Sequence, residues 1–145
     1  MKRILVATDG SEGAGRAVDF AAQLAMETGA NLQVINVTDD HGLPEAVMGQ
    51  FTRPQSAWIQ DMLTAHSAEL LRKARERART KGDITIHLES RSGDVAQSVL
   101  EVAGETAADA VVVGKRGSGR VAGLLLGSVS QKLVSLATGV VIVVP

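Results

Sequence analysis

The stretch over residues 111–130 constrains the fold of this chain more than any other. It opens with three valines, which predict a short buried β-strand, and Gly114 and Gly117 follow closely. After nine further residues comes Gly127-Ser128, where an apolar pattern of helical spacing begins. The order is therefore strand, glycine loop and helix start, which is typical of α/β proteins.

A loop and helix start of this kind predict an anion site. The first N–H groups of a helix have no partner within it and carry partial positive charge, so phosphate binds readily there. Lys115, Arg116 and Arg120 place cations around the loop, and Ser128 and Ser130 add hydroxyl groups. Glycine is also the usual residue wherever a loop needs positive φ, so the glycines alone are weak evidence. Their combination with the strand, the cations and the helix start favours phosphate binding.

Other phosphate-binding and catalytic motifs fit the chain less well. A Walker A loop needs Gly-Lys followed by Ser or Thr, and neither combination occurs. Residues 117–122 match the dinucleotide fingerprint G-x-G-x-x-A, but that fingerprint belongs after a first strand and needs an acidic residue about 20 positions later. The chain ends on Val-Val-Pro without such an acid, and it has no G-x-S-x-G elbow of a serine hydrolase.

Short apolar runs alternate with helical patterns along the whole chain. This alternation predicts an α/β fold with a doubly wound, five-stranded parallel sheet. The first and fourth strands are continuously apolar, so we place them centrally, in the order 3-2-1-4-5. Gln33 and Asn36 interrupt the second strand, which predicts shallower burial there. We expect strands at residues 4–7, 32–37, 84–88, 110–113 and 140–144, and helices between Ser11 and Gly29, at 57–81, after Asp94 and at 128–137.

In this order the topological switch lies between the first and fourth strands. Ligands of doubly wound sheets bind at the carboxyl ends of the strands that flank such a point. Those ends are Thr8-Asp9-Gly10 and the loop from Gly114 onward. The strand order and the glycine loop therefore predict the same crevice by independent arguments.

Four segments of the chain resemble the universal stress protein family. The spacing Gly114-x2-Gly117-x9-Gly127-Ser128 is similar to the nucleotide-binding signature of that family, and residues 4–11, 108–114 and 140–144 match further segments. The resemblance spans essentially the whole chain, residues 1–145, as one domain. It implies membership of the ATP-binding subgroup, with an adenine-nucleotide-binding, Rossmann-like sheet in the order 3-2-1-4-5.

The resemblance also implies roles for individual residues. ATP, with or without magnesium, is the expected cofactor, and the glycines and serines of the signature would hold its phosphates beside Arg116. Asp9 would accept hydrogen bonds from the ribose, and Ala7 and Val37 would pack on the adenine. Capping of the first helix explains Asp9 equally well, and core packing explains Ala7 and Val37. The expected nucleotide-binding residues are Ala7, Thr8, Asp9, Val37, Val113, Gly114, Arg116, Gly117, Gly127, Ser128, Val129 and Ser130.

Three classes of function fit these residues. They are an ATP-binding regulatory module of the stress response, a slow ATP hydrolase or nucleotidyl-transfer enzyme, and a structural dimer with an empty loop. The intact signature favours the first class. The second class needs a general base or a carboxylate pair for magnesium near the loop, and Asp9 is the only nearby candidate. We expect no catalytic residues and no metal site, because Asp39-Asp40-His41 has no second ligand cluster at a fixed spacing.

The composition argues against several partners. With 15 basic and 16 acidic residues the net charge is −1, which predicts no general attraction to nucleic acid or to anionic membranes. The chain has no cysteine, so disulfides and thiolate chemistry are excluded. No apolar run approaches the ~20 residues of a membrane span, and the N-terminus lacks the shape of a signal peptide. We therefore expect a cytoplasmic protein.

Two further expectations concern segments at the edges of the sheet. Residues 38–55 are irregular and rich in glycine and proline, so we expect a mobile loop that closes partly over the nucleotide. Residues 140–144 are apolar on both faces and would form an edge strand, which invites pairing with another chain. The resemblance supports a homodimer through this strand, while a helix or loop of the same chain covering it is the alternative.

Overall fold

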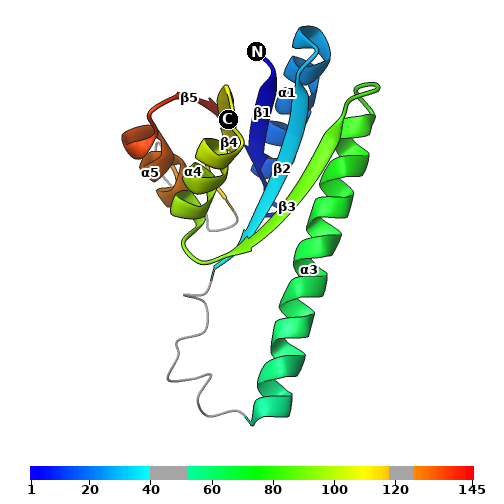
Figure 1. The fold of residues 1–145 in the computed structure, drawn as a ribbon, viewed down its shortest axis with the longest axis vertical. Coiled ribbons are helices and arrows are strands. Elements are labelled where there is room, and N and C mark those ends of the chain that lie inside the picture. Colours follow the sequence, from blue (N-terminus) through cyan, green and yellow to red (C-terminus); the bar gives the residue numbers. More distant parts are fainter. Residues whose placement is uncertain (40–51, 118–125) are drawn as a thin grey trace.

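Five strands form one sheet in this computed structural model, which describes residues 1–39, 52–117 and 126–145. All neighbouring strands are parallel, in the order β3-β2-β1-β4-β5 (Figure 1). The predicted α/β class and strand order are therefore confirmed. The strands are β1 (Arg3–Ala7), β2 (Asn31–Thr38), β3 (Ile86–Ser92), β4 (Ala110–Gly114) and β5 (Val140–Val144).

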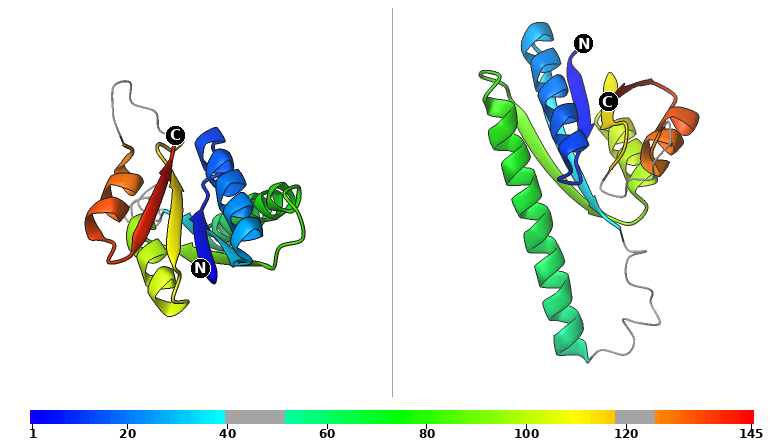
Figure 2. Two further views of the ribbon diagram at one scale, coloured as in Figure 1. Left: turned by 90° about the horizontal axis from the view of Figure 1, so that it is seen from above. Right: turned by 180° about the vertical axis from the view of Figure 1, so that it is seen from behind.

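Helices cover both faces of the sheet (Figures 1 and 2). One face carries α1 (Glu12–Thr28) and α3 (Arg53–Arg79), and the other carries α4 (Val95–Glu105) and α5 (Ser128–Leu136). The amino-terminal half of α3 extends beyond the end of the sheet (Figure 1). Parallel crossovers place successive helices on the two faces in this way because the connections are right-handed.

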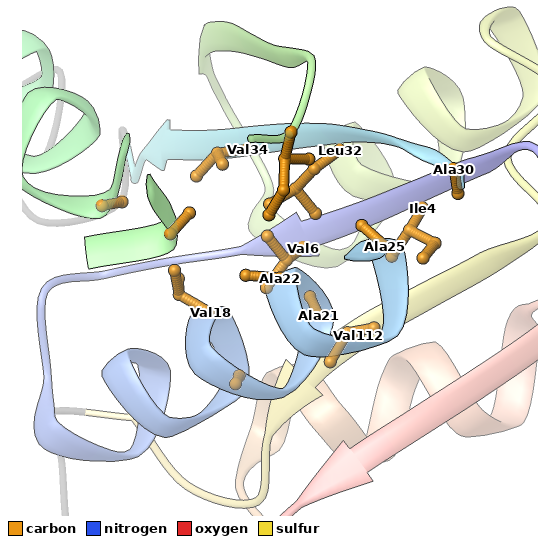
Figure 3. Close-up of a cluster of buried hydrophobic side chains, with 14 of the residues drawn as sticks. Ile4, Val6, Val18, Ala21, Ala22, Ala25, Ala30, Leu32, Val34 and Val112 are labelled. Carbon is orange, nitrogen blue, oxygen red and sulfur yellow. The ribbon is translucent and has the colours of Figure 1, made fainter. Parts of the chain in front are cut away.

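The core has two layers because the sheet is covered on both sides. Ile4 and Val6 of β1 belong to the cluster beneath α1 and α3 (Figure 3), whereas Leu5 between them packs towards α4 and α5. All three side chains are at most 1% exposed. A strand that buries both faces reads as a continuous apolar run, which explains the sequence of β1 and β4.

The helix ends follow local signals. Ser11 caps α1 by accepting from the backbone N–H of Ala14 at 3.2 Å, and Gly29 ends it with φ 73°. Thr52 and Gln55 form a capping box, so α3 begins four residues before its predicted start at residue 57. The predicted loop over residues 38–55 is therefore wrong at its carboxyl end, and its residues 40–51 lie outside the described part of the chain.

The bounds of β3 and the burial of one residue in β2 differ from the predictions. β3 starts at Ile86, two residues after the start of the predicted strand 84–88, and continues to Ser92. It continues because the ladder with β2 runs to Ser92 and Arg91 forms ion pairs with Glu89 and Glu105. β2 is more deeply buried than predicted at Asn36, which is 6% exposed, whereas Gln33 is only partly buried, as predicted. The amide of Asn36 tolerates burial because it is hydrogen-bonded.

Candidate functional site

A cavity of about 330 Å³ lies at the carboxyl ends of β1, β2 and β4, beside the start of α5. This is the topological switch of the sheet, where the crevice was predicted. The structure brings every predicted binding residue to the wall of this cavity. They are Ala7, Thr8, Asp9, Val37, Val113, Gly114, Arg116, Gly117, Gly127, Ser128, Val129 and Ser130.

The turn after β1 forms one wall of the cavity, and internal hydrogen bonds define its shape. The backbone N–H of Thr8 donates to the carbonyl oxygen of Ile35 at 2.9 Å, and the Thr8 hydroxyl accepts from the N–H of Gly10 at 3.2 Å. One carboxylate oxygen of Asp9 accepts from the N–H of Ser11 at 2.9 Å. Gly10 allows this turn because its φ is 81°, in the left-handed region. The Asp9 carboxylate is thereby held at the cavity.

The loop after β4 forms the opposite wall and approaches the β1 turn closely. A Cβ atom at Gly114 would lie 3.0 Å from backbone atoms of Gly13, and one at Gly117 would lie 2.5 Å from Oδ2 of Asp9. At Gly127 a Cβ atom would lie 3.2 Å from Cα of Arg116. Side chains at these positions would therefore meet neighbouring atoms at short distances, which gives all three glycines of the signature a structural reason.

The carbonyl oxygen of Lys115 joins this loop to α5. It accepts from the backbone N–H of Gly127 at 2.7 Å and from the hydroxyl of Ser130 at 2.8 Å. On its other side, the N–H of Lys115 donates to the carbonyl oxygen of Val144 at 2.7 Å. The N–H of Gly127 and the hydroxyl proton of Ser130 are thus used within the protein, where the sequence suggested contacts to phosphate.

The first turn of α5 lies at the cavity. Its N-cap residue is Gly127, and no side chain caps the turn. Side-chain caps are present on the other described helices, from Ser11, Thr52 and Asp94. Ser128 and Val129 are the first two residues of α5 and both line the cavity. Their N–H groups carry the positive end of the helix dipole, so this wall is suited to an anion.

The cavity has a polar and an apolar part. Ala7, Val37 and Val113 supply aliphatic surface at the strand ends, while Arg116 lines the cavity near the glycine loop. The carboxylates of Asp9 and Asp39 also line it. An aromatic ring system attached to an anionic group matches this combination, because the ring can cover the apolar part while the anion lies at α5.

Sequence reasoning missed five lining residues: Ser11, Ala14, Ile35, Asp39 and Val95. Ile35 was detectable, because strand alternation places it on the same face as Val37. Asp39 was weighed only as a metal ligand, although it directly follows the second strand. Val95 comes from α4, and no local pattern connects it with the glycine loop. Arg120 and the rest of residues 118–125 lie outside the described residues.

A second hollow of about 330 Å³ lies at the amino ends of the strands, with Arg3, Gln33 and His87 among its lining residues. It has neither a glycine loop nor a helix start, so the carboxyl-end cavity is the better candidate site. Within residues 1–39, 52–117 and 126–145, no three His, Asp or Glu side chains gather as a metal would require. In the same ranges no helix is both long and apolar enough to span a membrane.

Two solved structures of similar fold are complexes with adenine nucleotides. A universal stress protein in complex with cAMP has a TM-score of 0.71 at 29% identity, covering 99% of this chain and 95% of its own. A universal stress protein of Archaeoglobus fulgidus in complex with dAMP has a TM-score of 0.68 at 26% identity, with 100% and 98% covered. Universal stress protein UspA of Lactobacillus plantarum shares the fold, with a TM-score of 0.85 at 24% identity and 99% and 97% covered.

Sequence comparison leads to the same group of proteins. Universal stress protein YxiE of Bacillus subtilis is 29% identical over 145 residues, which cover 98% of this chain and 97% of the relative. A universal stress protein of Methanocaldococcus jannaschii is 31% identical over 148 residues, with 99% and 81% covered. The family model described as "Universal stress protein family" matches residues 1–145. The chain therefore belongs to the universal stress protein family.

Proposed function

We propose that this protein binds an adenine nucleotide, with ATP as the expected ligand, in the cavity at the carboxyl ends of β1, β2 and β4. The observation that carries the proposal is the uncapped first turn of α5, which lies on the same cavity as Arg116. Complexes of two related proteins with cAMP and dAMP support the choice of adenine nucleotides.

Each part of the nucleotide has a counterpart on the cavity wall. The phosphates would accept hydrogen bonds from the N–H groups of Ser128 and Val129, from the Ser128 hydroxyl and from Arg116. The Asp9 carboxylate would accept from the ribose hydroxyls, and the adenine would cover Ala7 and Val37. Charge-assisted hydrogen bonds contribute about 1.5–3 kcal/mol each, so a few of them suffice for micromolar affinity, about −8 kcal/mol.

We propose a regulatory role for this binding. Asp9 on the β1 turn and Gly117 on the loop after β4 face each other at close range, so a bound nucleotide would contact both walls at once. A ligand that links two separate segments stabilises the arrangement that it binds and shifts the protein towards it. Partners that recognise these segments would then respond to the nucleotide.

Calorimetry with ATP, AMP and cAMP tests the binding proposal. Gly117→Val should abolish binding, because its Cβ would displace Asp9 and its methyl groups would fill the phosphate end of the cavity. Gly104→Ala is the matched control: a Cβ there meets no atom within 4 Å, and its place in α4 is remote from the lining residues. Circular dichroism should show that both variants are folded. Equal affinity of Gly117→Val and wild type, or no binding by wild type, would disprove the proposal.

Slow ATP hydrolysis is a second candidate function, and the structure adds one observation in its favour that the sequence did not supply. Asp39 lines the cavity together with Asp9, so Asp9 is not the only carboxylate beside the candidate site. Two carboxylates and the nucleotide phosphates are the oxygen ligands that magnesium binds. In this function the metal would be held by the nucleotide and these two side chains.

We also propose that two copies of the chain pair through β5. The strand is at the edge of the sheet, and four of its five residues are only partly buried although all are apolar. Val134 and Leu136 of the neighbouring α5 are 51% and 64% exposed and extend the apolar surface. A second copy related by a twofold axis could satisfy the strand edge and cover these side chains in one closed contact.

A further inference from the structure

Asn36 is a buried polar residue next to the candidate site but not on it. It is 6% exposed, and it follows Leu32 and Val34 on the side of β2 that packs against α1 and α3. Its neighbours Ile35 and Val37 point to the other side and line the cavity, which Asn36 does not. Burying an amide is unfavourable unless it is hydrogen-bonded, so its partner is informative.

That partner is the carbonyl oxygen of Thr8, which accepts from the Asn36 side-chain amide at 2.8 Å. Thr8 belongs to the cavity wall and is the residue directly before Asp9. The contact therefore connects the core beneath α1 and α3 to the turn that carries the proposed ribose ligand.

The same oxygen is where the β1–β2 ladder would continue. The N–H of Thr8 donates to the carbonyl oxygen of Ile35 at 2.9 Å, and the next bond of a parallel ladder would run from the N–H of Val37 to the carbonyl oxygen of Thr8. The register of the two strands ends instead at Ala7 and Ile35. The Asn36 amide thus binds the oxygen at which further pairing would close the strand ends together, and it does so from the α1 and α3 side of the sheet rather than along the ladder.

We propose that Asn36 is a positioning residue that keeps β1 and β2 apart at the cavity. By holding the carbonyl of Thr8, its amide stops the ladder one bond early, orients the Asp9 turn and leaves the backbone N–H of Val37 facing the ligand space. An amide donor at this position would therefore set the width of the cavity at the end where the adenine is proposed to lie. The expected effect on nucleotide affinity rests on the proposed function, whereas the claim that Asn36 ends the β1–β2 ladder does not.

The test compares three variants. Asn36→Leu keeps the approximate volume but removes the donor, and Asn36→His restores an N–H at a similar distance from the backbone. Ser67→Ala is the control for loss of a buried polar group: Ser67 is 1% exposed and bonds Ser90, the register partner of Asn36, at 2.8 Å. Should Asn36→Leu fail to fold, Asn36→Ala replaces it, because it removes the donor without adding bulk.

Two quantities are measured under conditions where every variant is folded. The first is affinity for AMP and ATP by calorimetry, which should fall about tenfold or more in Asn36→Leu, recover in Asn36→His and stay unchanged in Ser67→Ala. The second is hydrogen exchange at the Val37 amide without ligand, which should slow by about tenfold or more in Asn36→Leu as Val37 joins the ladder.

An unchanged exchange rate at Val37 in Asn36→Leu would overturn the proposal, and so would unchanged affinity. An equal loss of affinity in Ser67→Ala would also overturn it, since loss of any buried polar group would then have the same effect. If the wild type binds no nucleotide, the proposed function fails, but the exchange measurement still decides whether Asn36 ends the ladder.

Discussion

The hydroxyl of Ser130 donates to the carbonyl oxygen of Lys115 at 2.8 Å, and this bond holds the start of α5 against the loop after β4. Ser130 is 2% exposed, whereas Ser128, two residues earlier in the same helical turn, is exposed on the cavity. The two serines therefore have different tasks. Ser130 joins α5 to the loop after β4, and Ser128 is available to the proposed nucleotide.

Replacing each serine with alanine should separate these tasks. Ser130→Ala should lower the free energy of unfolding by about 1–2 kcal/mol, because a buried hydrogen bond is lost. Ser128→Ala should change it by less than about 0.5 kcal/mol, since the side chain is exposed, but should weaken nucleotide binding. Urea unfolding and calorimetry measure the two effects. A stability loss in Ser128→Ala equal to that in Ser130→Ala would contradict this division.

The serines also illustrate how far the sequence could predict this protein. The strand order and the cavity were predictable, because continuous apolar runs mark the central strands and the glycine spacing marks the turn at the switch point. Which serine is exposed on the cavity was not predictable from that spacing. It depends on the position of the Lys115 carbonyl, which the ladder between β4 and β5 determines.

Errors at β2 and β3 have a common physical origin. Asn36 suggested a shallow strand because its partner, the carbonyl of Thr8, is 28 residues away. Glu89 and Arg91 lie in β3 beyond its predicted end at residue 88, and Arg91 is satisfied by Glu105 on α4. Polar residues in a strand indicate exposure only when no distant group satisfies them. By contrast, the early start of α3 was readable locally, from Thr52 and Gln55 at the spacing of a capping box.

Gly10 and Gly29 should differ in their tolerance of alanine, although both have φ in the left-handed region, at 81° and 73°. Alanine in that region costs about 1–2 kcal/mol. Gly29→Ala should lose only this amount, because a Cβ there meets no atom within 4 Å. Gly10→Ala should lose more, since its Cβ would lie 2.5 Å from Cδ2 of Leu70 and that side chain would have to move. Urea unfolding measures the free energy of unfolding of both variants. A loss of stability in Gly10→Ala equal to or smaller than that in Gly29→Ala would contradict the prediction.

ATP hydrolysis, if the protein catalyses it, should be far slower than the typical enzyme rate of about 10 per second. Among the described residues that line the cavity, the carboxylates of Asp9 and Asp39 are the groups suited to bind magnesium or accept a proton. Asp39→Asn should therefore lower any residual turnover while Ser67→Ala leaves it unchanged. Steady-state phosphate release at saturating ATP and magnesium is the measurement. Turnover at ordinary enzyme rates would make hydrolysis the main function.

The proposed dimer follows from the two sides of β5. Val141 and Val143 pack towards α4 and α5, and Ile142 and Val144 pack towards α1 and α3, but all four are only partly buried. The first residue of the strand, Val140, is 55% exposed. A bare apolar edge of this kind invites pairing with another chain, and no charge, proline or glycine interrupts it.

Lysine substitutions on this strand should therefore produce monomers. Ile142→Lys would place a charge in the contact, and Val140→Lys does so at a position that is exposed in the single chain, so it should not disturb folding. Met62→Lys is the matched control, because Met62 is 52% exposed on α3, which lies on the β3 side of the sheet (Figure 1). Light scattering at micromolar concentration should give wild type and Met62→Lys twice the chain mass of 15.1 kDa, and both β5 variants that mass itself. A wild-type mass near a single chain would refute the dimer.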